Sequence, residues 1–133
     1  MTLRRKRLPE VLQEPAGAFD ELIPVLERAK AALTDAVPGT RMPGRPLGEA
    51  LWAFESDLGE VRDRMDAWRA PEVEEQWVAA NDGLAESLAL AHRVRTEGSE
   101  PQGFEGLIAV MGDLLAPLEA FEAAGARFRE LRR

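Results

Sequence analysis

The sequence of 133 residues contains no cysteine and no tyrosine, and it has a single histidine, His92. The lack of cysteine excludes disulfides and thiolate metal sites. Ferritin-like di-metal bundles need inward-pointing Glu-x-x-His pairs, and the residue three positions before His92 is Ala89. We therefore expect no metal and no cofactor. We expect His92 on the flank or surface of its helix, and the alternative is a lone axial haem ligand.

Long apolar runs are also lacking. No stretch of 18 apolar residues occurs, so the sequence predicts no membrane span. Residues 1–7 resemble the basic start of a signal peptide, but Leu8-Pro9-Glu10 follows where an apolar segment should stand. We therefore expect a cytoplasmic protein.

Alanine, leucine, glutamate and arginine dominate the composition, and this mixture favours helix. Apolar residues recur in alternating steps of three and four, most regularly from Leu47 to Trp68. The pattern predicts an all-α fold, an antiparallel up-down-up-down four-helix bundle over residues 15–133, which is one domain in size. The predicted helices span about 16–37, 47–69, 71–97 and 103–131. The alternative joins the second and third into one rod kinked at Pro71.

Prolines mark the expected irregularities. Residues 1–14 show no helical stripe and are punctuated by Pro9 and Pro15, so we predict a flexible basic tail. Pro24 lies inside the first stripe, so that helix either begins just before it or is kinked there. Pro117 removes one backbone hydrogen bond and predicts a kink in the last helix.

Charge is distributed unevenly. The net charge of -7 argues against nucleic acid as the main partner. Arg4, Arg5, Lys6 and Arg7 make the start of the chain basic, and four arginines follow position 126. The intervening chain is therefore strongly acidic, so the basic ends could dock on an acidic surface or on a second copy.

Catalytic machinery is not evident. The stripes of the second and fourth predicted helices hold no acidic, basic or hydroxyl side chain. General acid–base or nucleophilic catalysis needs such a group positioned in a cleft. Gly39, Gly44 and Gly48 lack the context of a phosphate-binding loop and are predicted to be turn residues. We therefore expect that the protein is not an enzyme.

Trp52 departs most clearly from the pattern. It lies about 150° from the middle of its helix stripe, counting 100° per residue, on an otherwise acidic face. Either the loop at 38–46 or the N-terminal segment covers it, or it anchors a partner. Arg41 or Arg45 could stack on the ring in either case. Trp68 and Trp77 lie on their stripes and are predicted to be core residues.

These observations favour a non-enzymatic interaction, scaffold or adaptor bundle that binds a protein partner or itself as a homo-oligomer. The candidate partner-binding residues are Trp52, Arg41, Arg45, Arg4, Arg5, Lys6 and Arg7. The alternative is a bundle that binds an apolar small molecule. In that case kinks near Pro24 and Pro117, with Gly112 and Gly125, would open a cavity between helices.

Overall fold

The computed structural model describes residues 7–39, 44–97 and 103–132, and all regular secondary structure in these ranges is helical. The prediction of an all-α four-helix fold is confirmed. The α-helices are α1 (Glu10–Thr34), α2 (Leu47–Asp63), α3 (Glu74–Glu97), and α4 (Gly103–Leu115) with α5 (Ala120–Glu130), which together form the fourth segment. Short 3-10 turns are η1 (Met65–Trp68), η2 (Pro71–Val73) and η3 (Ala116–Glu119).

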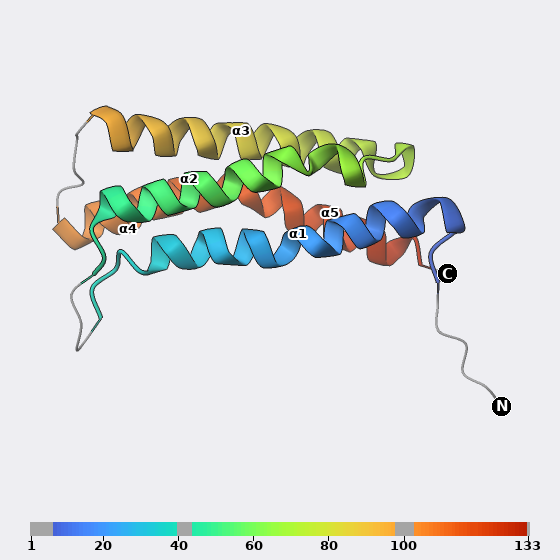
Figure 1. The fold of residues 1–133 in the computed structure, drawn as a ribbon, viewed down its shortest axis with the longest axis horizontal. Coiled ribbons are helices and arrows are strands. Elements are labelled where there is room, and N and C mark those ends of the chain that lie inside the picture. Colours follow the sequence, from blue (N-terminus) through green and yellow to red (C-terminus); the bar gives the residue numbers. More distant parts are fainter. Residues whose placement is uncertain (1–6, 40–43, 98–102, 133) are drawn as a thin grey trace.

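The four segments lie side by side, and Figure 1 shows each running opposite to the one before it. The start of α1 and the end of α5 therefore meet at one end of the bundle. The alternative of one continuous rod through Pro71 is wrong, because the chain reverses between α2 and α3. Arg69 and Ala70 are extended there, as expected for residues that lead into a proline.

The first helix starts earlier than predicted. α1 begins at Glu10, so the predicted tail is wrong for residues 10–14. Leu12 is fully buried and extends the apolar row toward Phe19, and this burial outweighs the missing backbone donor of Pro15. Pro24 also lies inside α1, so the helix does not begin there. Of the predicted basic tail, Arg4, Arg5 and Lys6 lie outside the described residues, and Arg7 is exposed.

An aromatic cluster fills the core at the end where the chain termini meet. Trp68 is fully buried, and its ring lies edge-on to that of Phe19 with centroids 5.0 Å apart. The buried Trp77 indole donates a hydrogen bond to the carbonyl of Met65 at 2.8 Å. The prediction that Trp68 and Trp77 are core residues is confirmed.

The fourth segment is interrupted at Pro117, as predicted, where the 3-10 turn η3 separates α4 from α5. Proline cannot donate to the helix ladder, so carbonyls in the preceding turn lose partners. The buried Ser87 hydroxyl of α3 donates to the carbonyl of Leu114 at 2.7 Å. Gly83 of α3 lies against the Pro117 carbonyl, so this turn is packed closely on α3.

The start of α4 is less buried than its sequence suggested. In the sequence, Ile108 and Leu115 widen the apolar stripe of this helix, which predicts central packing, but Phe104 is 61% exposed and Ile108 is 43% exposed. The main neighbour of α4 outside its own segment is α3. The first turns of α4 therefore lie at the edge of the bundle, and the expectation of central packing is wrong for them.

Candidate surface site on the α2–α3 face

Trp52 is the most exposed aromatic side chain among the described residues. It lies on α2, and 64% of its surface is accessible. No described residue of the loop or of the N-terminal segment covers it, and residues 1–6 and 40–43 lie outside the described residues. An indole on the surface leaves a large apolar area in water, so Trp52 is the natural starting point for a docking surface.

An arginine lies over the Trp52 ring, but it is not one of those expected. The guanidinium carbon of Arg95, on α3, is 5.0 Å from the ring centroid. This is within the range of a cation–π contact. Arg45 instead pairs with Glu49, with Nε and Oε2 3.5 Å apart. Arg41 lies outside the described residues.

Glu55 holds Arg95 in this position. Arg95 donates to both carboxylate oxygens of Glu55, and the second of these contacts, from Nη2 to Oε1, is 3.4 Å long. The Glu55 side chain is only 14% exposed. The hydrogen bond to Glu55 and the attraction between the charges raise the pKa of Arg95 above its already high value. Arg95 is therefore a permanent cation fixed between Glu55 and Trp52.

His92 completes this cluster. Its Nδ1 lies 3.4 Å from Oε1 of Glu55 and 3.3 Å from Nη2 of Arg95. Its side chain is mostly exposed, which agrees with the expected flank or surface position. The Glu55–His92–Arg95 cluster joins the middle of α2 to the last turns of α3.

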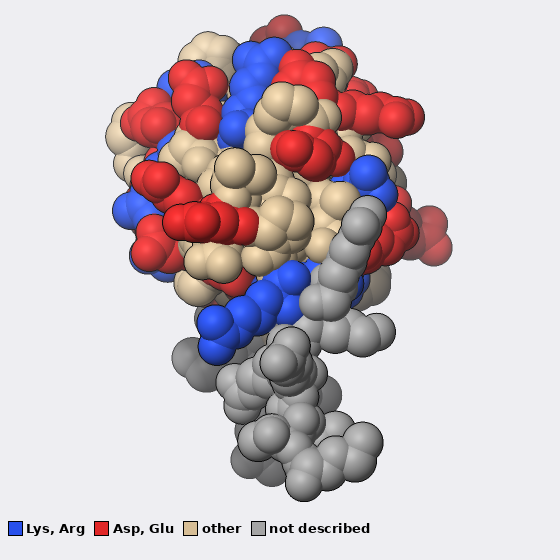
Figure 2. Space-filling view, turned by 90° about the vertical axis from the view of Figure 1, so that its right-hand side faces the viewer, with Lys and Arg blue, Asp and Glu red and all other residues tan. Residues whose placement is uncertain are grey.

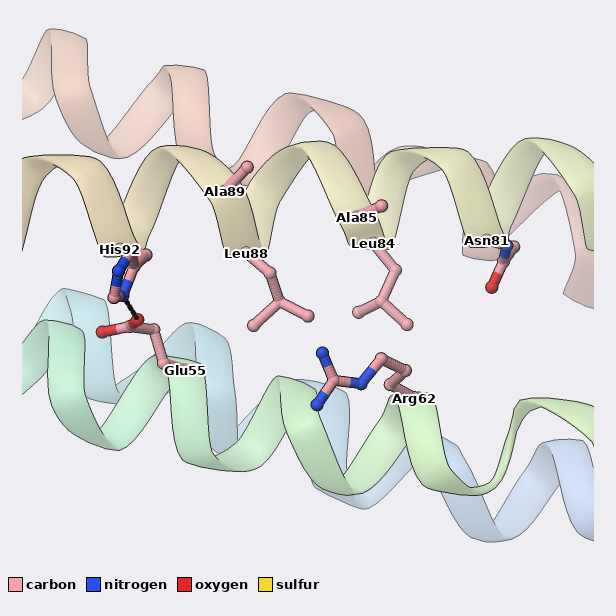
Figure 3. A pocket seen from close by; sticks show the side chains of 8 residues that line it. All are labelled: Glu55, Arg62, Asn81, Leu84, Ala85, Leu88, Ala89 and His92. Carbon is pink, nitrogen blue, oxygen red and sulfur yellow. Dashed lines mark ion pairs between the residues drawn. The ribbon is translucent and has the colours of Figure 1, made fainter.

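A groove of about 590 Å³ extends from this cluster along the α2–α3 face (Figure 3). Leu84 and Leu88 project between the two helices, and His92 and Glu55 lie at one end, as Figure 3 shows. Asn81 lies at the other end, and Arg62 lies across from the two leucines. The groove therefore has apolar side chains of α3 in its middle, with the Arg62 side chain facing them from α2, and polar side chains at its ends. Its lining residues are Glu55, Arg62, Asn81, Leu84, Ala85, Leu88, Ala89 and His92.

Small residues keep the groove open. Ala85 and Ala89 line it on α3. On α2, a Cβ built on Gly59 would meet nothing within 4 Å. Arg62 forms no ion pair within 4.0 Å with any residue in the described ranges. The arrangement therefore offers apolar surface and one unpaired guanidinium to a docking partner.

The described residues of the predicted basic ends, Arg7 and the arginines of the C-terminal segment, lie at the opposite end of the bundle. Arg132 lines two neighbouring grooves, one with Arg7 and the other with Arg129. Figure 2 looks at this end and shows basic side chains interspersed with acidic ones around an uncharged centre. This end is therefore of mixed charge, and it lies far along the bundle from Trp52, so Arg7 and Trp52 do not belong to one site.

A second groove runs between α1 and α5. It has a volume of about 430 Å³ and includes the buried rings of Phe19, Phe121 and Phe128. Gly125 opens it, because a Cβ there would lie 3.4 Å from the Phe19 ring. Charged side chains of both signs border it, including Glu122 and Arg129.

Other kinds of site find no support within the described residues. They contain no group of three or more histidine, aspartate or glutamate side chains placed to hold a metal ion. No helix in those ranges is long and apolar enough to cross a membrane.

Comparison with known proteins gives no further assignment. No protein family model, curated protein or solved structure shows a significant match to this chain. The function must therefore be argued from the surface itself.

Sequence reasoning found Trp52 but missed Glu55 and Arg95. A signal was present, because the off-stripe Val78 begins a second row on α3 with the spacing of three and four. That row continues through Asn81, Ala85, Leu88, His92 and Arg95. The role of this row depends on which part of α3 packs beside α2, and a pattern within one helix does not predict that.

Proposed function

We propose that this chain is a non-enzymatic protein-interaction bundle that self-associates through its α2–α3 face. The observation that carries the proposal is the 64% exposed Trp52 beneath the fixed guanidinium of Arg95. Tryptophan and arginine are the residues most enriched at the energetic centres of protein interfaces. Because the ion cluster with Glu55 already holds Arg95, little side-chain entropy is lost when a partner covers the pair.

The neighbouring groove supports the same function. Its apolar middle gains free energy when it is removed from water, and its small residues allow close approach of a partner helix. Most of the polar side chains at one end are satisfied by one another, so covering them leaves few unpaired groups. A buried donor or acceptor without a partner would cost about 1–3 kcal/mol.

Trp52→Ala tests this proposal. We expect the wild-type protein to self-associate reversibly, and we expect the variant to do so at least tenfold more weakly, since centre residues of interfaces contribute about 2 kcal/mol or more. Sedimentation velocity over a concentration series measures both dissociation constants.

Phe104→Ala is the matched control, because Phe104 is a comparably exposed aromatic, at 61%, but belongs to α4. Its dissociation constant should equal that of the wild type. A wild-type chain that stays monomeric over the whole concentration series contradicts the proposal. Equal weakening by both substitutions contradicts the assignment to the α2–α3 face.

The α1–α5 groove favours a second candidate, a bundle that binds an apolar small molecule. The groove lies beside Pro24 and Gly125, where a cavity was expected, whereas the turn at Pro117 is packed against Gly83. Its volume of about 430 Å³ is within the range of small-molecule sites. Native mass spectrometry of the purified protein should then show retained extra mass that is lost in Gly125→Leu, and a bare chain mass counts against this candidate.

A further inference from the structure

A second set of rows lies on the outer side of α2 and α3. Residues there repeat in steps of three and four, just as the core residues do, but they are partly or fully exposed, and six of them line the groove. A helix that carries two such rows can pack on two sides at once. The α2 row is Trp52, Glu55, Gly59 and Arg62, and the α3 row is Val78, Asn81, Ala85, Leu88, His92 and Arg95.

Two groove residues of opposite charge lie one on each side of a single point on α2. Glu55 and Arg62 are each about 5 Å from a point next to Gly59, at 1.5 Å per residue. Glu55 contacts His92 on α3, and Arg62 lies across from Leu84 (Figure 3). The point on α2 is therefore level with the turn of α3 that carries Leu88.

This symmetry makes the face complementary to itself. We propose that a second copy of this chain docks on it, with the two-fold axis perpendicular to α2 and passing next to Gly59. This inference rests on the proposed self-association and names its geometry. The axis sets α2 antiparallel on α2 of the second copy and α3 antiparallel on its α3. A two-fold interface brings the same patch of both copies together.

Charge complementarity supports a second copy of this chain as the partner that docks on this face. The axis places Glu55 of each copy opposite Arg62 of the other, so two ion pairs form from one acidic and one basic position. Arg62 has no ion-pair partner within 4.0 Å among the described residues.

Side-chain size is complementary as well. The axis crosses α3 level with Leu88 and Ala89, so Leu88 of each copy lies beside Ala89 of the other. Large side chains therefore meet small ones, and this arrangement fills the groove at close packing. Gly59 lies beside the axis, where the open space around its Cα allows the two α2 helices to approach closely.

The exposed apolar residues of this face lie on opposite sides of the axis. Val78 is 42% exposed and lies on the other side of the axis from the Trp52–Arg95 pair. Each Trp52–Arg95 pair therefore faces the end of the other copy that carries Val78.

The size of the face sets the expected affinity. The α3 row is about 26 Å long, and two helices side by side are about 20 Å wide. Such a face is somewhat smaller than a standard interface of about 800 Å² per partner. Each copy also carries a net charge of -7, which opposes association. We therefore expect a dimer with a dissociation constant in the micromolar range.

Opposite charge changes in two separate variants test which residues face one another across the axis. In Arg62→Glu, Glu55 faces a glutamate of the second copy. In Glu55→Lys, the lysine faces Arg62. We expect each variant alone to dimerise at least tenfold more weakly than the wild type. A one-to-one mixture restores both ion pairs, so we expect a heterodimer that forms at least tenfold more tightly than either variant forms a dimer with itself. Native mass spectrometry and sedimentation velocity measure the two populations.

Two further variants keep this test decisive. Arg93→Glu makes the same charge change on α3 outside the row, and Arg93 has no ion pair among the described residues; we expect it to leave the affinity unchanged. Glu55 holds Arg95 within the chain, and Glu55→Lys could therefore fail to fold. In that case the dissociation constants of Arg62→Glu and Arg93→Glu, compared with each other, test the proposed geometry.

The outcomes separate the two proposals. A mixture that restores dimerisation supports the register. If the wild type forms a dimer and Arg62→Glu weakens it no more than Arg93→Glu does, this geometry is overturned, but the proposed self-association is not. A wild-type chain that stays monomeric at all concentrations overturns both.

Discussion

Replacing Trp68 by alanine is expected to lower the free energy of unfolding by about 3–5 kcal/mol. Its ring is fully buried and lies within 6.4 Å, between centroids, of four other aromatic rings. These rings belong to α1, α5 and the start of α3, so the cavity left behind borders three helices that cannot all move inward. Small domains are stable by about 5–15 kcal/mol, and the variant should therefore be close to the limit of folding.

Chemical denaturation followed by far-ultraviolet circular dichroism measures this loss. Trp52→Ala is the matched control, because it removes the same side chain from the surface. At concentrations where the chain is monomeric, its free energy of unfolding should stay within about 0.5 kcal/mol of wild type. Equal losses in both variants would show that Trp68 is not the centre of the core.

Gly83→Ala is expected to destabilise the protein by about 1–3 kcal/mol, although alanine is the better helix former. A Cβ at this position would lie 2.1 Å from the carbonyl oxygen of Pro117 and 3.0 Å from its carbonyl carbon. Both atoms are backbone, so α3 and the η3 turn must separate. That movement also strains the hydrogen bond from Ser87 to the Leu114 carbonyl.

Gly17→Ala provides the control for this prediction. Gly17 lies inside α1, and a Cβ there would meet nothing within 4 Å. This substitution should stabilise the protein by about 0.4–1 kcal/mol, because alanine reduces the entropy of the unfolded chain. The two glycine substitutions should therefore shift the urea midpoint in opposite directions. A stabilised Gly83→Ala variant would contradict the close packing of α3 on the Pro117 turn.

The helices could be predicted from sequence because each buries an uninterrupted apolar row. Leu47 to Trp68 shows this most plainly, and the break at Ala70-Pro71 marks the turn to α3. The start of α1 could not be predicted in the same way, because Pro9 and Pro15 suggested loop. Leu12 shows the physical reason for the difference, since the burial of its side chain compensates for the missing donor of Pro15.

The candidate site could be predicted only in part. An off-stripe tryptophan is visible in the sequence, so Trp52 could be found by helix geometry alone. The contact of Arg95 with Trp52, and of Arg95 with Glu55, depends on the level at which α3 passes α2. That level is set by the turn through η1 and η2, and residues 43 positions apart along the chain cannot be aligned by a helical pattern. Arg41 and Arg45 were expected to stack on Trp52 only because they lie near it in sequence.

Disulfide cross-linking of Gly59→Cys tests the central claim most directly. The chain has no cysteine of its own, so a single introduced thiol can pair only with another copy. A disulfide needs Cα atoms about 4.4–6.8 Å apart, and the proposed axis passes next to residue 59. Gly112→Cys is the control, because Gly112 is equally open but lies on α4. We expect rapid formation of a covalent dimer with Gly59→Cys and none with Gly112→Cys, whereas equal or absent cross-linking in both would contradict docking through the α2–α3 face.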